Sequence, residues 1–240
     1  MKNGARSRLV VAVPVKDLTH AKQRLMSVLS VAERGELARA MLGDVLRALG
    51  GAGFEHVWVV TREPAVAAIA RALGAEPLAE AENRGHTAAV ALAQWEAARR
   101  GARVFLTVPG DVPRVTADEL KELAGAAGDG TPAFAPSRSR LGTNGVALAP
   151  PDAMPLTFGE PSFERHLDTA RARNLTPRVL ALPGLGLDID TPEDLTALVA
   201  EPNTTETGAL VASWFAHGQD RACRSHAASL SGHRRSKPAS

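Results

Sequence analysis

The fold is decided by Leu9-Val10-Val11-Ala12-Val13-Pro14-Val15-Lys16, an apolar run that ends in a proline and a cation. Its β-branched residues and its proline boundary predict a buried parallel strand. Lys22 and Arg24 follow Lys16 closely in the sequence. Because the carboxyl ends of parallel strands border the ligand crevice of an α/β sheet, these three cations are expected to bind phosphate. The alternative is a solvated basic loop after a strand.

Strands and helices alternate beyond this first strand. Ser30 and Glu33 have the Ser-x-x-Glu spacing of a helix capping box, and apolar residues follow them at helical spacing. Further strands are predicted over 57–60 and 104–108, and further helices over 64–73, 87–99 and 116–126. Strand, helix and strand in succession imply parallel pairing through right-handed crossovers. The predicted fold class is therefore α/β with a doubly wound, mostly parallel sheet.

The following part of the chain is less regular. Strand-like segments at 132–136 and 145–149 surround a predicted turn at 142–145. A helix over 162–173 is expected to stop at Asn174, a residue that tolerates the left-handed cap. The remaining predicted elements are a strand over 179–182 and a helix with Thr191 as its N-cap and Pro192 at its first position.

We expect a single domain over 1–200 and a C-terminal extension over 201–240. The extension is predicted to be partly helical around 210–215 and disordered from 219 onward, where Ser, Ala, Arg and His dominate. Trp214 and Phe215 are candidate contacts of a homodimer.

Composition limits the class of protein. The 240 residues are 45% hydrophobic and 22% charged, as in an ordinary soluble protein. The net charge is +2, and the sequence has no stripe of cations alternating with aromatic residues, so nucleic-acid binding is not expected. No apolar run has the length of a membrane span, and no secretory signal is recognised. Cys223 is the single cysteine and fits a reducing compartment, so we expect a cytoplasmic protein without membrane association.

Three aspartates are candidate metal ligands. Asp188 and Asp190 are two residues apart, so in an extended segment both side chains point to one side, with Cα atoms about 6.6 Å apart. Asp111 follows the strand predicted over 104–108, at the same sheet edge as the basic loop. Carboxylates beside phosphate-binding cations favour magnesium, which completes its coordination with water and substrate phosphates. The alternatives are a helix-capping role for Asp190 and an ordinary turn role for Asp111.

Three short polar segments are candidate ligand contacts. Gly85-His86-Thr87 opens a helix, where free backbone N–H groups suit an anion or a base edge. We expect His86 at the surface, without a role in proton transfer. Thr143 and Asn144 lie between two glycines and offer a hydroxyl and an amide to a carboxylate or phosphate. The segment Phe158-Gly159-Glu160-Pro161-Ser162 offers a similar group before a helix, although each of these segments could be a simple turn.

These motifs resemble one family, the guanylyltransferases of coenzyme F420 biosynthesis (CofC/FbiD), in order from about Leu9 to Ala200. The residues that carry the resemblance are Pro14-Val15-Lys16, Ala21-Lys22-Gln23-Arg24-Leu25, the Pro-x-Asp-x-Pro around Asp111, Gly142-Thr143-Asn144, Phe158-Gly159, Ser162-Phe163, His166 and Asp188-Ile189-Asp190-Thr191-Pro192-Glu193-Asp194. One segment departs from the pattern. The family often has Gly-Leu-Asn where this chain has Gly85-His86-Thr87, so this segment does not support the guanine preference.

The resemblance implies a nucleotidyltransferase fold of the sugar-nucleotide-transferase type, with GTP and magnesium as partners. The implied acceptor is a three-carbon phospho-acid: phosphoenolpyruvate, 2-phospho-L-lactate or 3-phospho-D-glycerate. The implied magnesium ligands are Asp111, Asp188 and Asp190, and the implied acceptor contacts are Thr143, Gly159 and Ser162. The residues expected to bind the nucleotide are Pro14, Lys16, Lys22, Arg24, Gly85 and Thr87. The three cations among them are expected to be catalytic.

The expected reaction is attack of an acceptor phosphate oxygen on the α-phosphorus of GTP, with release of pyrophosphate. An ionised phosphate is already a nucleophile, so no general base is needed, in agreement with the absence of a His or Cys constellation. The alternatives are a sugar-phosphate nucleotidyltransferase and a non-catalytic nucleotide-binding module of the same fold. A dinucleotide-binding Rossmann enzyme is disfavoured, because the glycine-rich segment 50–53 follows a predicted helix and not a strand.

Overall fold

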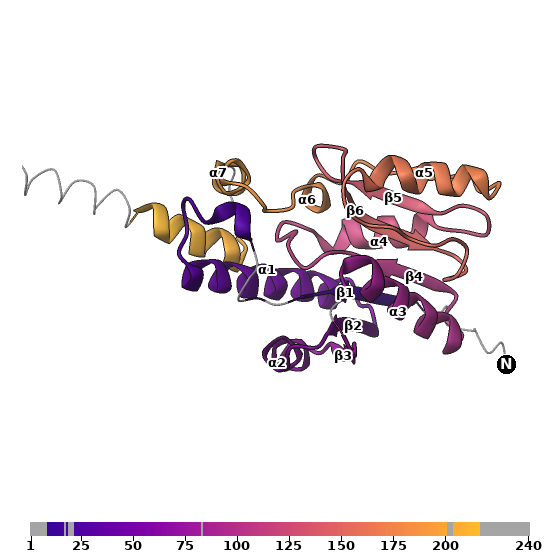
Figure 1. Ribbon diagram of the computed structural model, residues 1–240, viewed down its shortest axis with the longest axis horizontal. Helices are drawn as coiled ribbons and strands as arrows, with labels where there is room; N and C mark the ends of the chain where they lie inside the picture. Colours follow the sequence, from indigo (N-terminus) through magenta and orange to yellow (C-terminus); the bar gives the residue numbers. More distant parts are fainter. Residues whose placement is uncertain (1–8, 17, 19–21, 83, 201–203, 217–240) are drawn as a thin grey trace, which may run out of the picture.

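The structure is a computed structural model that describes residues 9–16, 18, 22–82, 84–200 and 204–216. Its strands are β1 (Leu9–Pro14), β2 (His56–Thr61), β3 (Glu76–Ala79), β4 (Val104–Thr107), β5 (Ala133–Pro136), β6 (Thr143–Leu148) and β7 (Arg178–Val179). Its helices are the 3-10 turn η1 (Gln23–Leu25), α1 (Val31–Gly51), α2 (Pro64–Ala72), α3 (His86–Arg99), α4 (Ala117–Ala126), α5 (Ser162–Ala172), α6 (Pro183–Gly186) and α7 (Pro192–Ala200). The strands form a seven-stranded sheet in the order β3-β2-β1-β4-β6-β5-β7 (Figure 1).

The pairing confirms the predicted α/β class. β1 pairs in parallel with β2 on one side and with β4 on the other, and β3 extends the sheet in parallel beyond β2. β6 runs antiparallel to β4 and β5, and β7 pairs in parallel with β5. Among the described strands, β6 alone has the opposite direction, so the sheet is mostly parallel.

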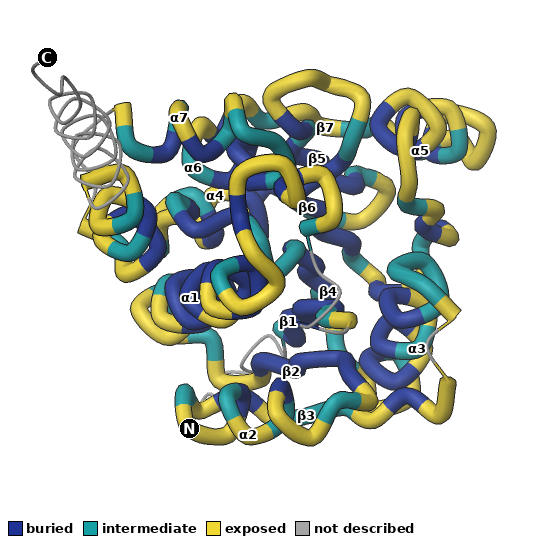
Figure 2. Tube along the Cα trace, turned by 60° about the vertical axis from the view of Figure 1, so that its left-hand side comes forward, coloured by how far each residue is buried: buried dark blue, intermediate teal, exposed yellow. Residues whose placement is uncertain are grey.

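The sheet separates two hydrophobic cores. Val11 and Val13 of β1 belong to the core that contains residues of α1, α2, α4, α6 and α7, whereas Val10 and Ala12 belong to the core that contains residues of α3 and α5. Figure 2 shows α1 and α3 on opposite sides of the buried strands β1, β2 and β4. Because both faces of β1 are covered, its sequence is continuously apolar, which is the pattern that predicted a buried parallel strand.

Helix ends follow the predicted local chemistry. Ser30 and Thr116 each form a complete capping box, with Glu33 and Glu119 at the third helical position. Asn174 follows α5 with φ 59°, as predicted for a left-handed cap. These signals are local in the sequence, so they can be recognised without knowledge of tertiary contacts.

The prediction and the structure differ at three strands, β3, β6 and β7. β3 was not predicted at all, and the strand predicted over 179–182 is β7, which covers only Arg178–Val179. The predicted turn at 142–145 is wrong, because β6 begins at Thr143 and the chain turns between Ser137 and Gly142. Polar residues at the start of β6 resemble a turn locally, but pairing with β5 makes them part of the sheet.

A helix over 206–216 packs on α1. Val211 is buried in the core that contains α1, and Trp214 packs against it, whereas Phe215 is 47% exposed. The division of the chain at residue 200 and dimerisation through Trp214 and Phe215 stay predictions. Cys223 and the tail predicted to be disordered lie outside the described residues. Within the described part, no helix combines the length and the apolar composition needed to cross a bilayer.

Candidate active site

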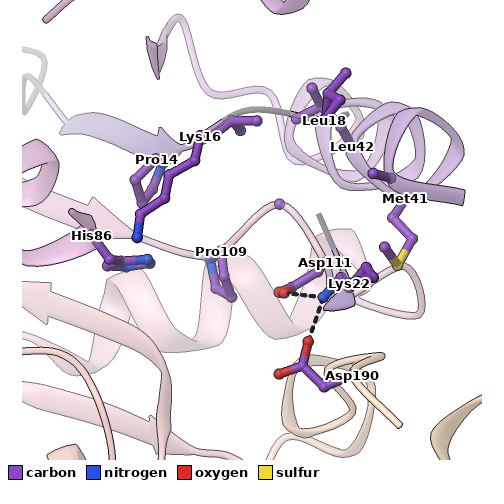
Figure 3. A pocket seen from close by; sticks show the side chains of 13 residues that line it. Pro14, Lys16, Leu18, Lys22, Met41, Leu42, His86, Pro109, Asp111 and Asp190 are labelled. Atoms are coloured by element: carbon purple, nitrogen blue, oxygen red, sulfur yellow. Dashed lines mark hydrogen bonds and ion pairs between the residues drawn. The ribbon is translucent and has the colours of Figure 1, made fainter. Parts of the chain in front are cut away.

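A cavity of about 570 Å³ lies at the carboxyl ends of β1 and β4, the sheet edge where α/β proteins bind ligands. Figure 3 shows Lys16 and His86 on one side of this cavity and Lys22, Asp111 and Asp190 on the other. The remaining lining residues are Pro14, Val15, Leu18, Ala38, Met41, Leu42, Pro109 and Gly110. The structure therefore brings together residues that the sequence assigned separately to phosphate and metal binding.

Lys22 joins two of the three candidate metal ligands. Its Nζ lies 2.6 Å from Asp111 Oδ2 and 2.7 Å from Asp190 Oδ1, and its side chain is only 8% exposed. Burial alone would lower the pKa of Lys22, but the charges of Asp111 and Asp190 outweigh burial and raise that pKa above its ordinary value. Lys22 is thus a fixed cation in the cavity.

Asp188 lies beside this pair but has a different environment. Its carboxylate accepts a hydrogen bond from Asn144 Nδ2 at 3.0 Å. Burial raises the pKa of Asp188, the Asn144 hydrogen bond lowers it, and the charges of Asp111 and Asp190 raise it further, so the net shift is upward. A backbone hydrogen bond of 3.1 Å from Ile189 N to Asp111 O holds the two acidic segments together.

The carboxylates provide oxygen ligands of the kind that magnesium prefers. Asp111 Oδ1 is buried and has no hydrogen-bond partner among the described residues, so a cation could bind it. In the described part of the chain, however, no three acidic, His or Cys side chains form a ready metal site, and Lys22 Nζ contacts both Asp111 and Asp190. The residues fit a divalent cation in chemistry, and Lys22 would compete with it for two of the oxygens.

Lys16 and His86 form the opposite wall. A Cβ at Gly85 would lie 3.9 Å from Lys16 Nζ, and Gly85 has φ 101°, which favours glycine. His86 lines the cavity and is half-buried, in contrast to its expected surface position, and its ring lies 4.4 Å from the Phe158 ring. Burial lowers the pKa of His86 to about 4, with Asp111 opposing and Lys16 reinforcing the shift. His86 is therefore neutral near pH 7.

Arg24 does not line this cavity. It borders a neighbouring hollow together with Arg138, Asp188 and Asp190. Asp190 lines both spaces, so Arg24 lies next to the site and not at its centre. The three cations of the basic loop are divided between two adjoining hollows.

The predicted acceptor contacts form a second group around the start of β6. Thr143 Oγ1 lies 3.0 Å from His166 Nδ1 and 3.3 Å from Ser162 Oγ. Thr87 Oγ1 accepts a 2.9 Å hydrogen bond from Phe158 N, so Thr87 fastens the segment before Gly159 to α3. Gly159 is exposed, with φ 100°.

Comparison with known proteins decides the family. The family described as "Guanylyl transferase CofC like" matches residues 9–213. The chain belongs to the CofC-like guanylyl transferases. It is therefore a nucleotidyltransferase, and the resemblance drawn from its motifs is confirmed.

Two curated relatives of this CofC-like protein are named for different acceptors. The phosphoenolpyruvate guanylyltransferase of Rubrobacter xylanophilus is 41% identical over 189 residues, which cover 78% of this chain and 92% of the relative. The 2-phospho-L-lactate guanylyltransferase of Methanothermobacter thermautotrophicus is 36% identical over 187 residues, which cover 78% and 82%. A crystal structure assigned to the nucleotide-diphospho-sugar transferases, from Desulfovibrio desulfuricans G20, has a TM-score of 0.71 at 17% identity, covering 88% of this chain and 96% of that one. This likeness confirms the implied fold.

Two contacts of the CofC-like site were missed at the level of sequence. Asn144 was a candidate ligand contact, but its amide is used to hold Asp188 and the carbonyl of Leu185. His166 belongs to the motifs of the resemblance, which imply no role for it, yet it contacts Thr143. Its spacing from Ser162 and Ala170 on the predicted helix, four residues each, places all three on one buried face and could have indicated the contact.

Proposed function

We propose that this enzyme transfers GMP from GTP to the phosphate of a three-carbon phospho-acid, releases pyrophosphate, and serves coenzyme F420 biosynthesis. The observation that carries this proposal is the cavity in which Lys16 and Lys22 face Asp111 and Asp190 at the carboxyl edge of the sheet. The activities for which the two relatives are named support GTP as donor and a phospho-acid as acceptor. Cytoplasmic location stays a prediction.

The chemistry requires little covalent participation by the protein. One phosphate oxygen of the acceptor forms a bond to the α-phosphorus of GTP, and the bond from that phosphorus to the departing pyrophosphate breaks. Since the attacking oxygen is already ionised, positioning and charge neutralisation are the main tasks of the enzyme. Lys16 and Lys22 are suited to binding the triphosphate as point charges, and Arg24 at the adjoining hollow is suited to binding an outer oxygen as a fork.

We assign a divalent cation, magnesium, to Asp111, Asp188 and Asp190. When bound, this ion would supply positive charge to the reacting phosphates. Asp111 Oδ1 is the oxygen best suited to it, because it is buried and lacks a hydrogen-bond partner among the described residues. The ammonium group of Lys22 supplies further positive charge to the same phosphates.

The experiment is mass spectrometry of products from GTP with phosphoenolpyruvate, 2-phospho-L-lactate and 3-phospho-D-glycerate, beside a sugar 1-phosphate. We expect a GMP adduct with at least one phospho-acid and none with the sugar phosphate. An adduct with the sugar phosphate alone would support the sugar-nucleotide alternative. If no reaction releases pyrophosphate, the non-catalytic alternative is correct and the proposal fails.

Asp188→Asn tests the assignment of the metal. The substitution keeps the shape of the side chain but removes its negative charge, so turnover should fall by about 100-fold or more, while the chain stays folded. Pyrophosphate release and circular dichroism measure the two effects. Asp152→Asn, at an exposed loop position, is the matched control and should leave turnover unchanged. Near-normal turnover of the Asp188 variant would remove Asp188 from the metal site.

A further inference from the structure

His166 is buried on α5 and has both ring nitrogens hydrogen-bonded. Thr157 N lies 3.0 Å from Nε2, and Thr143 Oγ1 lies 3.0 Å from Nδ1. The ring stacks on Phe134 at 5.7 Å and meets the edge of Phe158 at 5.1 Å. The ring therefore has little freedom to turn.

The backbone contact determines the tautomer of His166. A peptide N–H can only donate, so Nε2 must be an acceptor and cannot carry a proton. The proton of the neutral ring is then on Nδ1, which donates to Thr143 Oγ1. Burial lowers the pKa of His166 to about 4, with smaller contributions from Arg165 and His86, in agreement with a neutral ring.

This tautomer determines which hydrogen bonds the hydroxyl groups of Thr143 and Ser162 donate and accept. Thr143 Oγ1 accepts from His166 Nδ1 and also from Ser162 Oγ at 3.3 Å, which uses both of its lone pairs. The Thr143 proton is then left to donate elsewhere. If the hydrogen bond within the hydroxyl pair is reversed, the Ser162 proton is left instead, so in either case the pair has one free O–H donor.

The pair lies at the start of β6, close in the fold to the segments that carry the carboxylates. Val146 of β6 pairs with Thr107 of β4, so Thr143 lies alongside the loop that carries Asp111. The next residue, Asn144, holds Asp188 through its amide. The Thr143 and Ser162 pair therefore belongs to the same sheet edge as the carboxylates.

We propose that His166 is a positioning residue that makes the Thr143 and Ser162 pair a hydrogen-bond donor to a carboxylate or phosphate oxygen of the acceptor. This inference rests on the proposed function, because it requires the acceptor at the start of β6. His166 neither touches the acceptor nor transfers a proton. Its effect is to exclude the arrangement in which Thr143 donates to the ring and the pair has no donor left.

Two variants separate this role from simple packing. In His166→Asn, the side-chain amide can occupy the place of Nδ1–H and still donate to Thr143. In His166→Gln, the side-chain oxygen can reach the place of Nε2 and accept from Thr157 N, but the donor to Thr143 is lost. We expect His166→Gln to raise the KM of the phospho-acid by about tenfold or more and His166→Asn to raise it by less than about threefold, with the KM of GTP unchanged in both. Equal effects of the two variants, or a change confined to the KM of GTP, would overturn the proposal.

Nitrogen NMR of histidine in the wild-type chain provides a readout that does not depend on activity. We expect the Nδ1–H tautomer of His166 across pH 6–8, and loss of that signature in both variants. The Nε2–H tautomer, or a charged ring at pH 7, would overturn the inference even if the enzyme is active. If the wild-type chain forms no adduct with any phospho-acid, the proposed function is wrong, and so is the donor role of the Thr143 and Ser162 pair. The tautomer of His166 is tested independently by NMR.

Discussion

Lys22 joins segments of the chain that are far apart in the sequence. Its ammonium group contacts Asp111 and Asp190, which are 89 and 168 residues away. Its backbone has φ 55° and ψ 46°, a left-handed conformation in which few non-glycine residues are found. When one partner of a buried ion pair is removed, the remaining charge is left uncompensated, so this residue matters for both stability and charge balance.

Lys22→Met should lower kcat/KM for GTP by about 100-fold or more, because it removes a fixed cation from the cavity. Pyrophosphate release measures the effect. Lys121→Met is the matched control, since Lys121 is exposed on α4 and forms an ion pair with the exposed Asp118. It should retain wild-type kinetics. Wild-type kinetics of the Lys22 variant would show that Lys22 serves only to hold the loops together.

His166 should make the stability of the enzyme depend on pH. Its pKa is about 4 in the folded chain and about 6.5 when unfolded, so the unfolded chain takes up the proton first as the pH falls. The stabilisation from this group is fully present above pH 6.5 and decreases toward pH 4, by about 3 kcal/mol in total. Urea unfolding of wild type and His166→Asn between pH 7.5 and 4.5 measures it. The free-energy difference between the two chains should shrink with falling pH, and a constant difference would contradict the prediction.

At the scale of elements, β6 brings the two halves of the site together. It runs antiparallel between β4 and β5, so its first residues lie at the carboxyl ends of the parallel strands. Thr143 contacts α5, whereas the next residue, Asn144, contacts the α6 segment. The register of β6 against β5 shifts here, which interrupts the regular alternation of side chains between the two faces of the sheet. Gly145 follows, where the sheet is closely covered by α4 and α6.

Gly145→Ala should destabilise the protein by about 1–3 kcal/mol. A Cβ at this position would lie 2.5 Å from Leu123 Cδ2 and 2.7 Å from Leu185 Cδ2, so both leucines would have to move. Urea unfolding gives the free energy. Gly125→Ala is the control on α4, where an added Cβ meets nothing within 4 Å, and it should stabilise the helix by about 0.5–1 kcal/mol. Equal stabilities of the two variants would show that the core around β6 adapts without strain.

A helix or strand could be predicted from the sequence where the residues that stabilise it are close together in the chain. β1 and the capped helices were predicted because a continuous apolar run and a capping box are local patterns. β3, with the sequence Glu76-Pro77-Leu78-Ala79, has no β-branched residue and lies at the edge of the sheet, where it pairs with β2. The start of β6 resembles a turn in the sequence because its residues are polar, and the partners that fix them, such as His166, come from a distant helix.

At the scale of the whole molecule, the helix over 206–216 extends the core of α1. Asp44, a buried acid on α1, accepts hydrogen bonds from Glu206 N at 3.0 Å and from Thr207 N at 2.9 Å. Thr207 Oγ1 adds a third hydrogen bond, and Arg47 pairs with both Asp44 and Glu206. Asp44 thus caps a helix that lies more than 160 residues farther along the chain. The sequence could not indicate this contact, because an acid within an amphipathic helix looks like an ordinary surface residue.

Asp44→Asn should loosen the helix over 206–216. The amide replaces one acceptor oxygen with a donor that faces other donors, so hydrogen bonds to Glu206 N or Thr207 are lost and a charge is removed. We expect a loss of about 3 kcal/mol in the free energy of unfolding and faster amide exchange in this helix. Asp118→Asn is the matched control, because Asp118 is a 94% exposed acid on α4, and it should change stability by less than about 0.5 kcal/mol. If amide exchange in the helix is unchanged in the Asp44 variant, apolar packing of Val211 and Trp214 on α1, and not the buried carboxylate, holds the C-terminal helix in place.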